Sequence, residues 1–241
     1  MTAADVRQAL LELADPARVV QLQRFFKTGP GQYGEGDRFI GPPVPVQRKV
    51  VDAFRELPPE EVEKLIQNPF HECRFVGLMI WCAQVKSKHT PVAVRADRAA
   101  RYLRLRAYVN SWDLVDTSAP MLLGDWLLAS GADRGILDEL AAENHLWSQR
   151  MAILATLTFI RRGQFADTLR LAETLLTHPH DLMHKAVGWL LREVGKREVE
   201  ALHEFLREHA GRMPRTALRY AIEKLPEGER RAYLQLRIMN S

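Results

Sequence analysis

The stretch MHKAVGWLLREV, residues 183–194, places a basic residue just before a long apolar segment. After Lys185, apolar residues recur at spacings of three and four, which is typical of an α-helix with one buried face. The same order of polar residues, a basic residue and an apolar helix recurs along the chain. The other copies are VQRKVVDAF (46–54), ECRFVGLMIW (72–81), WSQRMAILATL (147–157) and MPRTALRYAIEKL (213–225). The repetition predicts a chain built from similar helical units.

The spacing of these units predicts their architecture. Successive basic residues, with Asp113 of SWDLVDTSAPMLL (111–123) in the equivalent place, lie between 26 and 39 residues apart. This range is typical of helix-pair repeats of the HEAT type. We therefore expect an all-α fold, a curved solenoid of stacked HEAT-like helix pairs that forms one domain over residues 1–241. Helix starts carry partial positive charge, so the row of basic residues predicts a basic groove on the concave face. The row comprises Arg48, Arg74, Arg150, Lys185 and Arg215.

Composition favours a soluble protein with a polyanionic partner. The chain has 241 residues, 46% of them hydrophobic, a formal net charge of +4 and a sequence pI of about 9.2. Such a surplus of positive charge favours nucleic acid as the partner. The N-terminus lacks the basic start and apolar block of a signal peptide, and no apolar run approaches the roughly 20 residues of a membrane span. We interpret the protein as cytoplasmic, with no membrane contact.

The two cysteines, Cys73 and Cys82, fall nine residues apart on one predicted helix. This spacing matches neither a redox motif nor a zinc site, and it predicts two buried thiols. The histidines of HPHDLMH (178–184) are interrupted by a proline and have no repeated carboxylate partner, so no metal site is predicted. No serine or cysteine has the local signature of a nucleophile.

Residues 28–45, TGPGQYGEGDRFIGPPVP, are rich in glycine and proline and predict a loop. The loop contains the pattern G-x-G-x-x-G. A dinucleotide fingerprint requires a strand before the pattern and a helix directly after it, whereas here a helix precedes and more loop follows. We therefore predict no cofactor. The segment RADRAARYLRLR (95–106) has arginines at three-residue steps, and we interpret them as a solvated helix face.

The segment VNSWDLVDTSAP (109–120) sets Trp112 and Asp116 four residues apart, on one face of a predicted helix. Two interpretations are open from spacing alone. In the first, Trp112 belongs to the core, Asp113 caps the helix and Asp116 pairs with an arginine. In the second, the tryptophan and the carboxylate form a site. Trp189 lies on the face of Lys185 in a later repeat, with Arg192 three residues on.

Four segments together resemble the DNA alkylation repair family of AlkD-like DNA glycosylases. They are FFKTGPGQYGEGDRFIG (25–41), VNSWDLVDTSAP (109–120), WSQRMAIL (147–154) and HKAVGWLLREVGK (184–196). The resemblance runs from about residue 10 to residue 230. It implies a C-shaped HEAT-like solenoid with duplex DNA on the concave face. It also implies excision of N3- and N7-alkylated purines, chiefly 3-methyladenine and 7-methylguanine, in base excision repair and without base flipping.

The resemblance also implies roles for individual residues. The family's catalytic aspartate matches Asp116, and its two tryptophans that flank the lesion sugar match Trp112 and Trp189. The family's phosphate-contacting arginine matches Arg150, the basic residue one turn after the second tryptophan matches Arg192, and a tyrosine near the end of an early helix matches Phe25. We also expect Lys185 and Lys27 to contact DNA. Phe25 stands where the family has a tyrosine, so a hydroxyl is missing there.

The chemistry of the lesion fits these residue types. An N3- or N7-alkylated purine carries a positive charge and departs as a neutral base, so it needs no strong general acid. The sugar left behind is positively charged, and a carboxylate can stabilise that charge. We expect a monofunctional glycosylase that acts as a monomer in a bacterial-type cytoplasm, associated with the nucleoid. The alternatives are a non-catalytic helical-repeat protein that binds bent or branched DNA, and a protein-binding scaffold.

Overall fold

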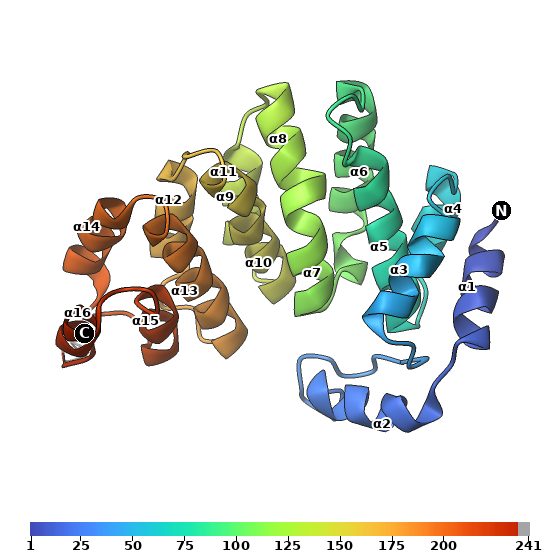
Figure 1. The fold of residues 1–241 in the computed structure, drawn as a ribbon, viewed down its shortest axis with the longest axis horizontal. Coiled ribbons are helices and arrows are strands. Elements are labelled where there is room, and N and C mark those ends of the chain that lie inside the picture. The colour runs from blue at the N-terminus through green and yellow to red at the C-terminus, as the bar shows by residue number, and fades with distance from the viewer. Residues whose placement is uncertain (236–241) are drawn as a thin grey trace. The chain divides into compact units, whose positions relative to one another are not determined.

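The computed structural model of the chain describes residues 1–235, and their fold is all-α (Figure 1). Within these residues no β-strand occurs, and one isolated bridge joins Arg38 to Phe70. The prediction of an all-α fold is confirmed. In the same range, no helix is long and apolar enough to cross a membrane.

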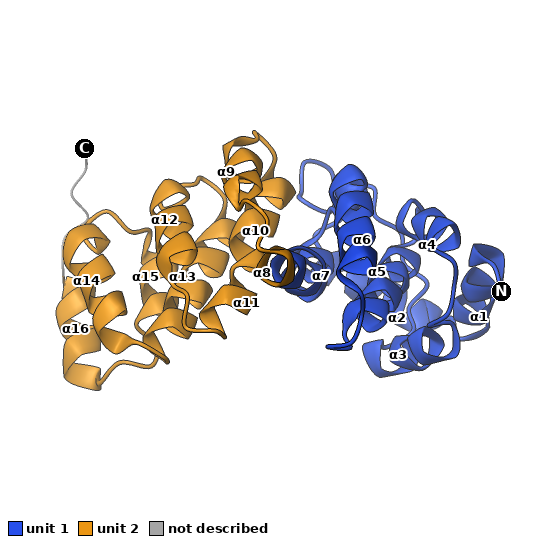
Figure 2. Cartoon of the chain, turned by 90° about the horizontal axis from the view of Figure 1, so that it is seen from above, with its two compact units in different colours: residues 1–126 blue, residues 127–241 orange. Residues whose placement is uncertain are grey.

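The chain divides into two compact units, Met1–Trp126 and Leu127–Ser241 (Figure 2). The helices of the first unit are α1 (Ala3–Glu12), α2 (Pro16–Phe25), α3 (Val44–Ala53), α4 (Pro59–Ile66), α5 (His71–Val85), α6 (Val92–Arg104), the 3₁₀ turn η1 (Arg106–Tyr108), α7 (Trp112–Ala119) and the π-helical turn η2 (Pro120–Gly124). The helix α8 (Asp125–Ser130) contains the boundary. The second unit continues with α9 (Gly135–Ala142), α10 (Leu146–Ala155), α11 (Leu157–Ile160), α12 (Ala166–Thr174), α13 (Asp181–Gly195), α14 (Val199–His209), α15 (Arg215–Ala221) and α16 (Glu227–Gln235).

Within each unit, consecutive helices joined by short connections pack side by side. In the first unit α4 lies against α5, and in the second α9 lies against α10 and α13 against α14 and α15. Glycines permit the closest approaches. A Cβ atom at Gly77 of α5 would lie 3.0 Å from the Cβ atom of Leu65 on α4. The predicted helix pairs are thus present in both units.

The basic residues of the repeat all lie within the first five residues of their helices. Both cysteines lie on α5, where they are buried free thiols, as predicted. The arginines of α6 differ from the predicted solvated face. Arg101 pairs with Glu63 at 2.6 Å and with Glu60 at 3.0 Å, so this face is neutralised by acids on α4.

Candidate functional site

The first turn of α7 carries the residues that the sequence singles out. Trp112 is the first residue of the helix and Asp116 lies one turn later, so both occupy one face, and both are half-buried. Ser111 occupies the N-cap position but makes no side-chain capping bond. The half-exposure of both side chains leaves an indole and a carboxylate accessible together at one helix end.

Trp112 belongs to a cluster of rings, here called the aromatic cluster: Phe25, Phe26, Phe39, His71 and Trp112. Phe26 stacks on Trp112 with ring centroids 5.6 Å apart and an interplanar angle of 14°, and Phe25 meets the indole edge-on at 5.9 Å. Phe26 and Phe39 each lie 4.8 Å from the His71 ring. The loop after α2 and the start of α5 thus fix the plane of the indole. Phe25, at 63% exposure, is the open side of the cluster.

Behind the aromatic cluster lies a buried ionic network, here called the His71 network: Asp37, His71, Arg74 and Asp113. The His71 Nδ1 atom lies 2.7 Å from the Oδ2 atom of Asp37, and its Nε2 atom lies 2.8 Å from the Oδ2 atom of Asp113. Arg74 donates from Nη2 to the other oxygen of Asp37 at 2.6 Å. Asp113 therefore braces α7 against α5 instead of capping its own helix.

Electrostatics in the His71 network favour the charged imidazole. Burial alone would lower the pKa of His71, but the carboxylates of Asp113 and Asp37 outweigh it and raise the pKa to about 9. Burial opposes ionisation of Asp37 in the same way, yet hydrogen bonds and charges from His71 and Arg74 hold the pKa of Asp37 below its usual value. The network is a buried set of two carboxylates with two cations.

The loop between α2 and α3 is fixed to α5 by Glu72. The two carboxylate oxygens of Glu72 accept from the backbone N–H groups of Ile40 at 2.9 Å and Gly41 at 2.8 Å. Gly41 has φ +106°, and a Cβ atom there would lie 2.2 Å from the carbonyl oxygen of Asp15. Only glycine fits that conformation and that approach. The predicted loop is thus confirmed, and it packs against the site.

Asp116 is the fifth of the eight residues of α7. Four residues later Pro120 lacks the N–H group that would bond to the carbonyl of Asp116, and the chain forms the π-helical turn η2 there. Burial raises the pKa of Tyr102, and the nearby charge of Asp116 adds to this rise. Tyr102 therefore remains a neutral phenol, whose hydroxyl lies 2.8 Å from the Oγ atom of Ser118. π-helical turns are often found at functional sites.

The second unit holds the other predicted residues on α13. Lys185, Trp189 and Arg192 follow at steps of four and three, so they share one face. Each has a carboxylate partner. The Nζ atom of Lys185 lies 2.7 Å from Asp181, the Trp189 indole hydrogen-bonds to Glu193, and Arg192 pairs with Glu223.

Arg150 and Lys27 lie in contrasting surroundings. Arg150 on α10 is 4% exposed, and its guanidinium donates to the carbonyl of Leu182 at the start of α13. A phosphate contact by Arg150 stays a prediction. Lys27 is exposed and adopts φ 53°, an uncommon conformation for a residue with a side chain, at the point where the chain leaves α2.

The histidines of residues 178–184 organise the start of α13. His180 caps the helix by accepting from the N–H group of Leu182 at 3.1 Å, and the Nε2 atom of His178 lies 2.9 Å from the Oε1 atom of Gln149. His184 bonds to the carbonyl of His178. These contacts give the three side chains a structural role.

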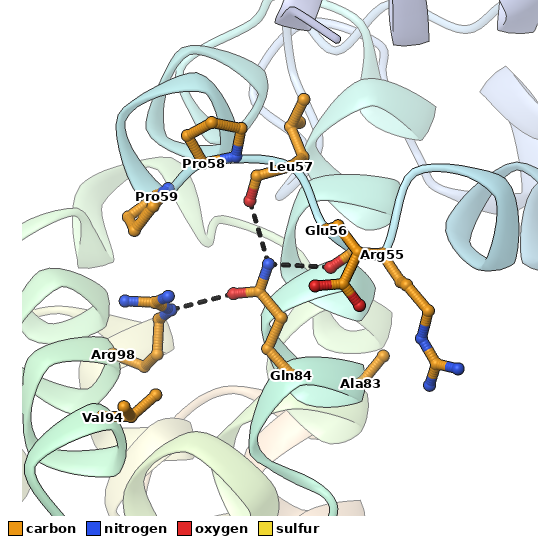
Figure 3. Close-up of a pocket in the computed structure, with 9 residues that line it drawn as sticks. All are labelled: Arg55, Glu56, Leu57, Pro58, Pro59, Ala83, Gln84, Val94 and Arg98. Atoms are coloured by element: carbon orange, nitrogen blue, oxygen red, sulfur yellow. Dashed lines mark hydrogen bonds between the residues drawn. The ribbon is translucent and has the colours of Figure 1, made fainter.

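A depression of about 390 Å³ lies elsewhere in the first unit, between the α3–α4 turn, the end of α5 and α6 (Figure 3). Gln84 spans it. Its Nε2 atom donates to the carbonyls of Arg55 and Leu57, both at 2.9 Å, and its Oε1 atom accepts from Arg98 at 3.0 Å. None of the predicted site residues lines this depression.

Sequence reasoning missed the His71 network. Its partners to His71 are separated from it by 34 and 42 residues, so no local motif announces them. One signal was available. His71, Glu72 and Arg74 open a helix that is otherwise largely apolar and buried, and buried charged groups require partners.

Comparisons with known proteins agree with the resemblance. A family model described as "DNA alkylation repair enzyme" matches residues 6–225. Among solved structures, the chain is similar to a protein described as a predicted DNA alkylation repair enzyme from Enterococcus faecalis. The TM-score is 0.66 at 18% identity, over 89% of this chain and 97% of that one, so this likeness concerns the fold. No curated protein matches. Because the family match extends over both units, the chain belongs to the family of DNA alkylation repair enzymes.

Proposed function

We propose that the protein is a monofunctional DNA glycosylase that excises cationic N3- and N7-alkylated purines, such as 3-methyladenine and 7-methylguanine, from duplex DNA. One observation carries the proposal. An indole held flat by a ring stack and a carboxylate one turn away lie together, half-exposed, at the start of α7.

The reaction would break the bond between C1′ of the sugar and the purine nitrogen. The base leaves with the bonding electrons and becomes neutral, because it began as a cation. The sugar becomes an oxocarbenium-like cation, and a water molecule then adds to C1′ and releases a proton. Asp116 stabilises the positive sugar and orients the water. The face of Trp112 adds a cation–π attraction of about 1–2 kcal/mol where water is excluded.

The assignment of Asp116 over Asp113 follows from their contacts. Asp113 is bonded to His71 within the buried network, so its carboxylate is already committed to a cation. Asp116 shares a helix face with Trp112, so the two side chains can meet the same sugar.

The DNA contacts of Arg150, Arg192, Trp189 and Phe25 are proposed from the family resemblance, and those of Lys185 and Lys27 from their positive charge. Lys185 and Arg192 would meet backbone phosphates, Trp189 the sugar, and Lys27, Phe25 and Arg150 the flanking DNA. Lys185 supports the monofunctional assignment, because an imine-forming lyase needs a desolvated lysine. Its Nζ atom is instead paired with Asp181, and its side chain is 42% exposed. We propose that the protein acts as a monomer, in the cytoplasm and without base flipping.

The decisive experiment measures release of free 7-methylguanine from a duplex that carries one lesion. We expect release by the wild-type protein and loss of release with Asp116→Asn at unchanged DNA affinity. Protein that binds the duplex tightly but releases no base would contradict the proposal and favour a non-catalytic DNA-binding role.

A further inference from the structure

The structure assigns a positioning role to His71. We infer that His71 donates one hydrogen bond to Asp37 and one to Asp113, and thereby holds Trp112 and Asp116 in the orientation that excision requires. The inference rests on the proposed function and adds a residue that touches neither DNA nor the reacting atoms.

The hydrogen bonds themselves require a charged ring. Ionised carboxylates only accept, and a neutral imidazole has a single N–H group, so it could donate to one of the two aspartates but not to both. Contacts of 2.7 Å and 2.8 Å on the two ring nitrogens therefore indicate an imidazolium. The raised pKa of His71 agrees with this.

The imidazolium joins three segments that lie far apart in the sequence. Asp37 belongs to the loop after α2, His71 opens α5, and Asp113 lies in the first turn of α7. Asp113 directly follows Trp112, so fixing its carboxylate fixes the start of the helix. The His71 ring also supports the stack of Phe39 and Phe26 on which the indole rests.

The surrounding charged groups make the link between these three segments depend on the second ring proton of His71. The charged and titratable groups around His71 are Arg18 of α2, Asp37 and Arg38 of the loop, Glu72 and Arg74 of α5, and Asp113 of α7. Glu72 is bonded to two backbone N–H groups, and Arg74 is bonded to Asp37. Without the second ring proton of His71, one of the two aspartates loses its hydrogen bond from the ring, and its negative charge is less well compensated.

The first test compares His71→Gln with a matched control, His209→Gln. His209 is also a buried histidine packed on a phenylalanine, with ring centroids 4.4 Å apart, but it lies on α14. In single-turnover excision of 7-methylguanine, we expect His71→Gln to slow the chemical step about 10- to 100-fold, the scale for a misplaced reacting group. DNA affinity should change less than about twofold, and His209→Gln should excise at the wild-type rate. Wild-type excision by His71→Gln would overturn the inference.

A second measurement needs neither a variant nor catalytic activity. Amide hydrogen exchange of the wild-type protein, corrected for intrinsic rates, is followed from pH 7 to pH 10 alongside an NMR titration of the His71 ring. We expect protection at residues 115 and 116, the first amides of α7 with a backbone acceptor, to fall together with deprotonation of His71, while residues 190–191 of α13 keep theirs. Constant protection at the start of α7 through that titration would overturn the inference.

The two measurements separate failure of the inference from failure of the proposed function. If the wild-type protein excises nothing, the proposed function fails. Hydrogen exchange still tests whether protonated His71 holds the start of α7 in place. If His71→Gln does not fold, the exchange experiment on the wild-type protein decides. If the wild-type protein excises normally and protection does not follow His71, only the positioning role is lost.

Discussion

At the scale of single residues, two aspartates three positions apart on α7 have different surroundings. The side chain of Asp113 is 17% exposed and bonded to an imidazolium, so its charge is compensated inside the protein. One of its oxygens, Oδ1, is buried without a hydrogen-bond partner. Asp116 lies one turn from Trp112 on the same helix face. Burial and pairing of the first carboxylate suit it to stability, and the position of the second suits it to catalysis.

This contrast predicts opposite effects of the same substitution. Asp116→Asn should reduce excision by about 10²–10³ at nearly unchanged stability, because it removes one preorganised charge. Asp113→Asn should cost about 1–3 kcal/mol of stability, because His71 loses its charged partner in a buried place. Urea unfolding and single-turnover release of 7-methylguanine measure the two effects. The reverse pattern, with Asp113→Asn inactive and Asp116→Asn active, would exchange the roles.

His71 also predicts a pH dependence of stability. Its pKa rises from an ordinary value of 6.5 to about 9 on folding, so the folded state binds the proton more tightly than the unfolded state. The resulting stabilisation is complete below pH 6.5, declines as the pH rises towards 9 and is absent above it. The shift corresponds to about 3 kcal/mol. Urea unfolding at pH 6, 7.5 and 9 should show this decline in the wild-type protein. His71→Gln should lack this component, and equal slopes in the two proteins would contradict the prediction.

At the scale of elements, the helix from Trp112 to Ser130 shows what proline does when packing is strong. Pro120 would be expected to end or kink a helix, since it removes one hydrogen bond. Here the chain widens into the π-helical turn η2 and continues as α8. Pro120, Leu122 and Leu123 are buried, so side-chain packing stabilises the irregular turn. The sequence does not announce this outcome, because the packing comes from distant helices.

Close packing of α13 on α15 gives a second test at this scale. A Cβ atom at Gly188 would lie 2.4 Å from the carbonyl oxygen of Ala217 and 2.6 Å from the Cβ atom of Tyr220. Gly188→Ala should therefore destabilise the protein by about 1–3 kcal/mol through overpacking. Gly228→Ala in α16 is the matched control. A Cβ atom there meets nothing within 4 Å, so helix propensity should make the change neutral or stabilising. Thermal unfolding of both variants decides, and an unaffected Gly188→Ala would show that the two helices separate easily.

A feature could be predicted from the sequence when neighbouring residues determine it. Helix starts and the glycine-rich loop depend on neighbouring residues, and both were predicted from apolar spacing and turn residues. Whether a basic side chain is buried or exposed was not predicted. Arg150 follows the same local pattern as Lys185, yet it is buried against Leu182, whereas Lys185 lies at the surface beside Asp181. For Arg150 the partner lies 32 residues away, so the local pattern does not reveal that the side chain is buried.

At the scale of the whole molecule, the sequence predicts one domain over residues 1–241. The structure divides the chain into two compact units, and the family match extends over both. The net charge is only +4 because 30 acidic residues offset 34 basic ones, and many of the basic side chains are paired with those acids. DNA binding would replace some of those partners by phosphates, and its strength would fall with salt as counterions are released. The salt dependence of DNA binding thus depends on how many acidic partners are replaced by phosphates.

Lys185 provides the test of that exchange. Lys185→Ala should weaken binding to every duplex sequence and reduce the slope of log affinity against log salt by about one, because one phosphate contact is lost. Lys64→Ala is the control, since Lys64 on α4 is paired with Glu61 at 2.5 Å and has no assigned contact. Fluorescence anisotropy between about 50 and 200 mM salt covers the sensitive range. A Lys185→Ala protein with the wild-type slope would remove Lys185 from the phosphate contacts.

The lesion itself should be chosen by charge more than by size. A cationic purine leaves as a neutral base, whereas hypoxanthine or uracil must be protonated to leave, and an aspartate that is ionised at neutral pH is a poor acid for that step. The site proposed on α7 presents an indole face and a carboxylate to the sugar, and it includes no set of polar groups that reads a base edge, as base-flipping enzymes require. Bulky N3- or N7-alkyl adducts should therefore be released, and hypoxanthine should be left in place. Parallel assays on otherwise identical duplexes measure both releases. Efficient excision of hypoxanthine together with refusal of the bulky cation would require a closed base pocket and a proton donor, and Asp116 beside Trp112 would supply neither.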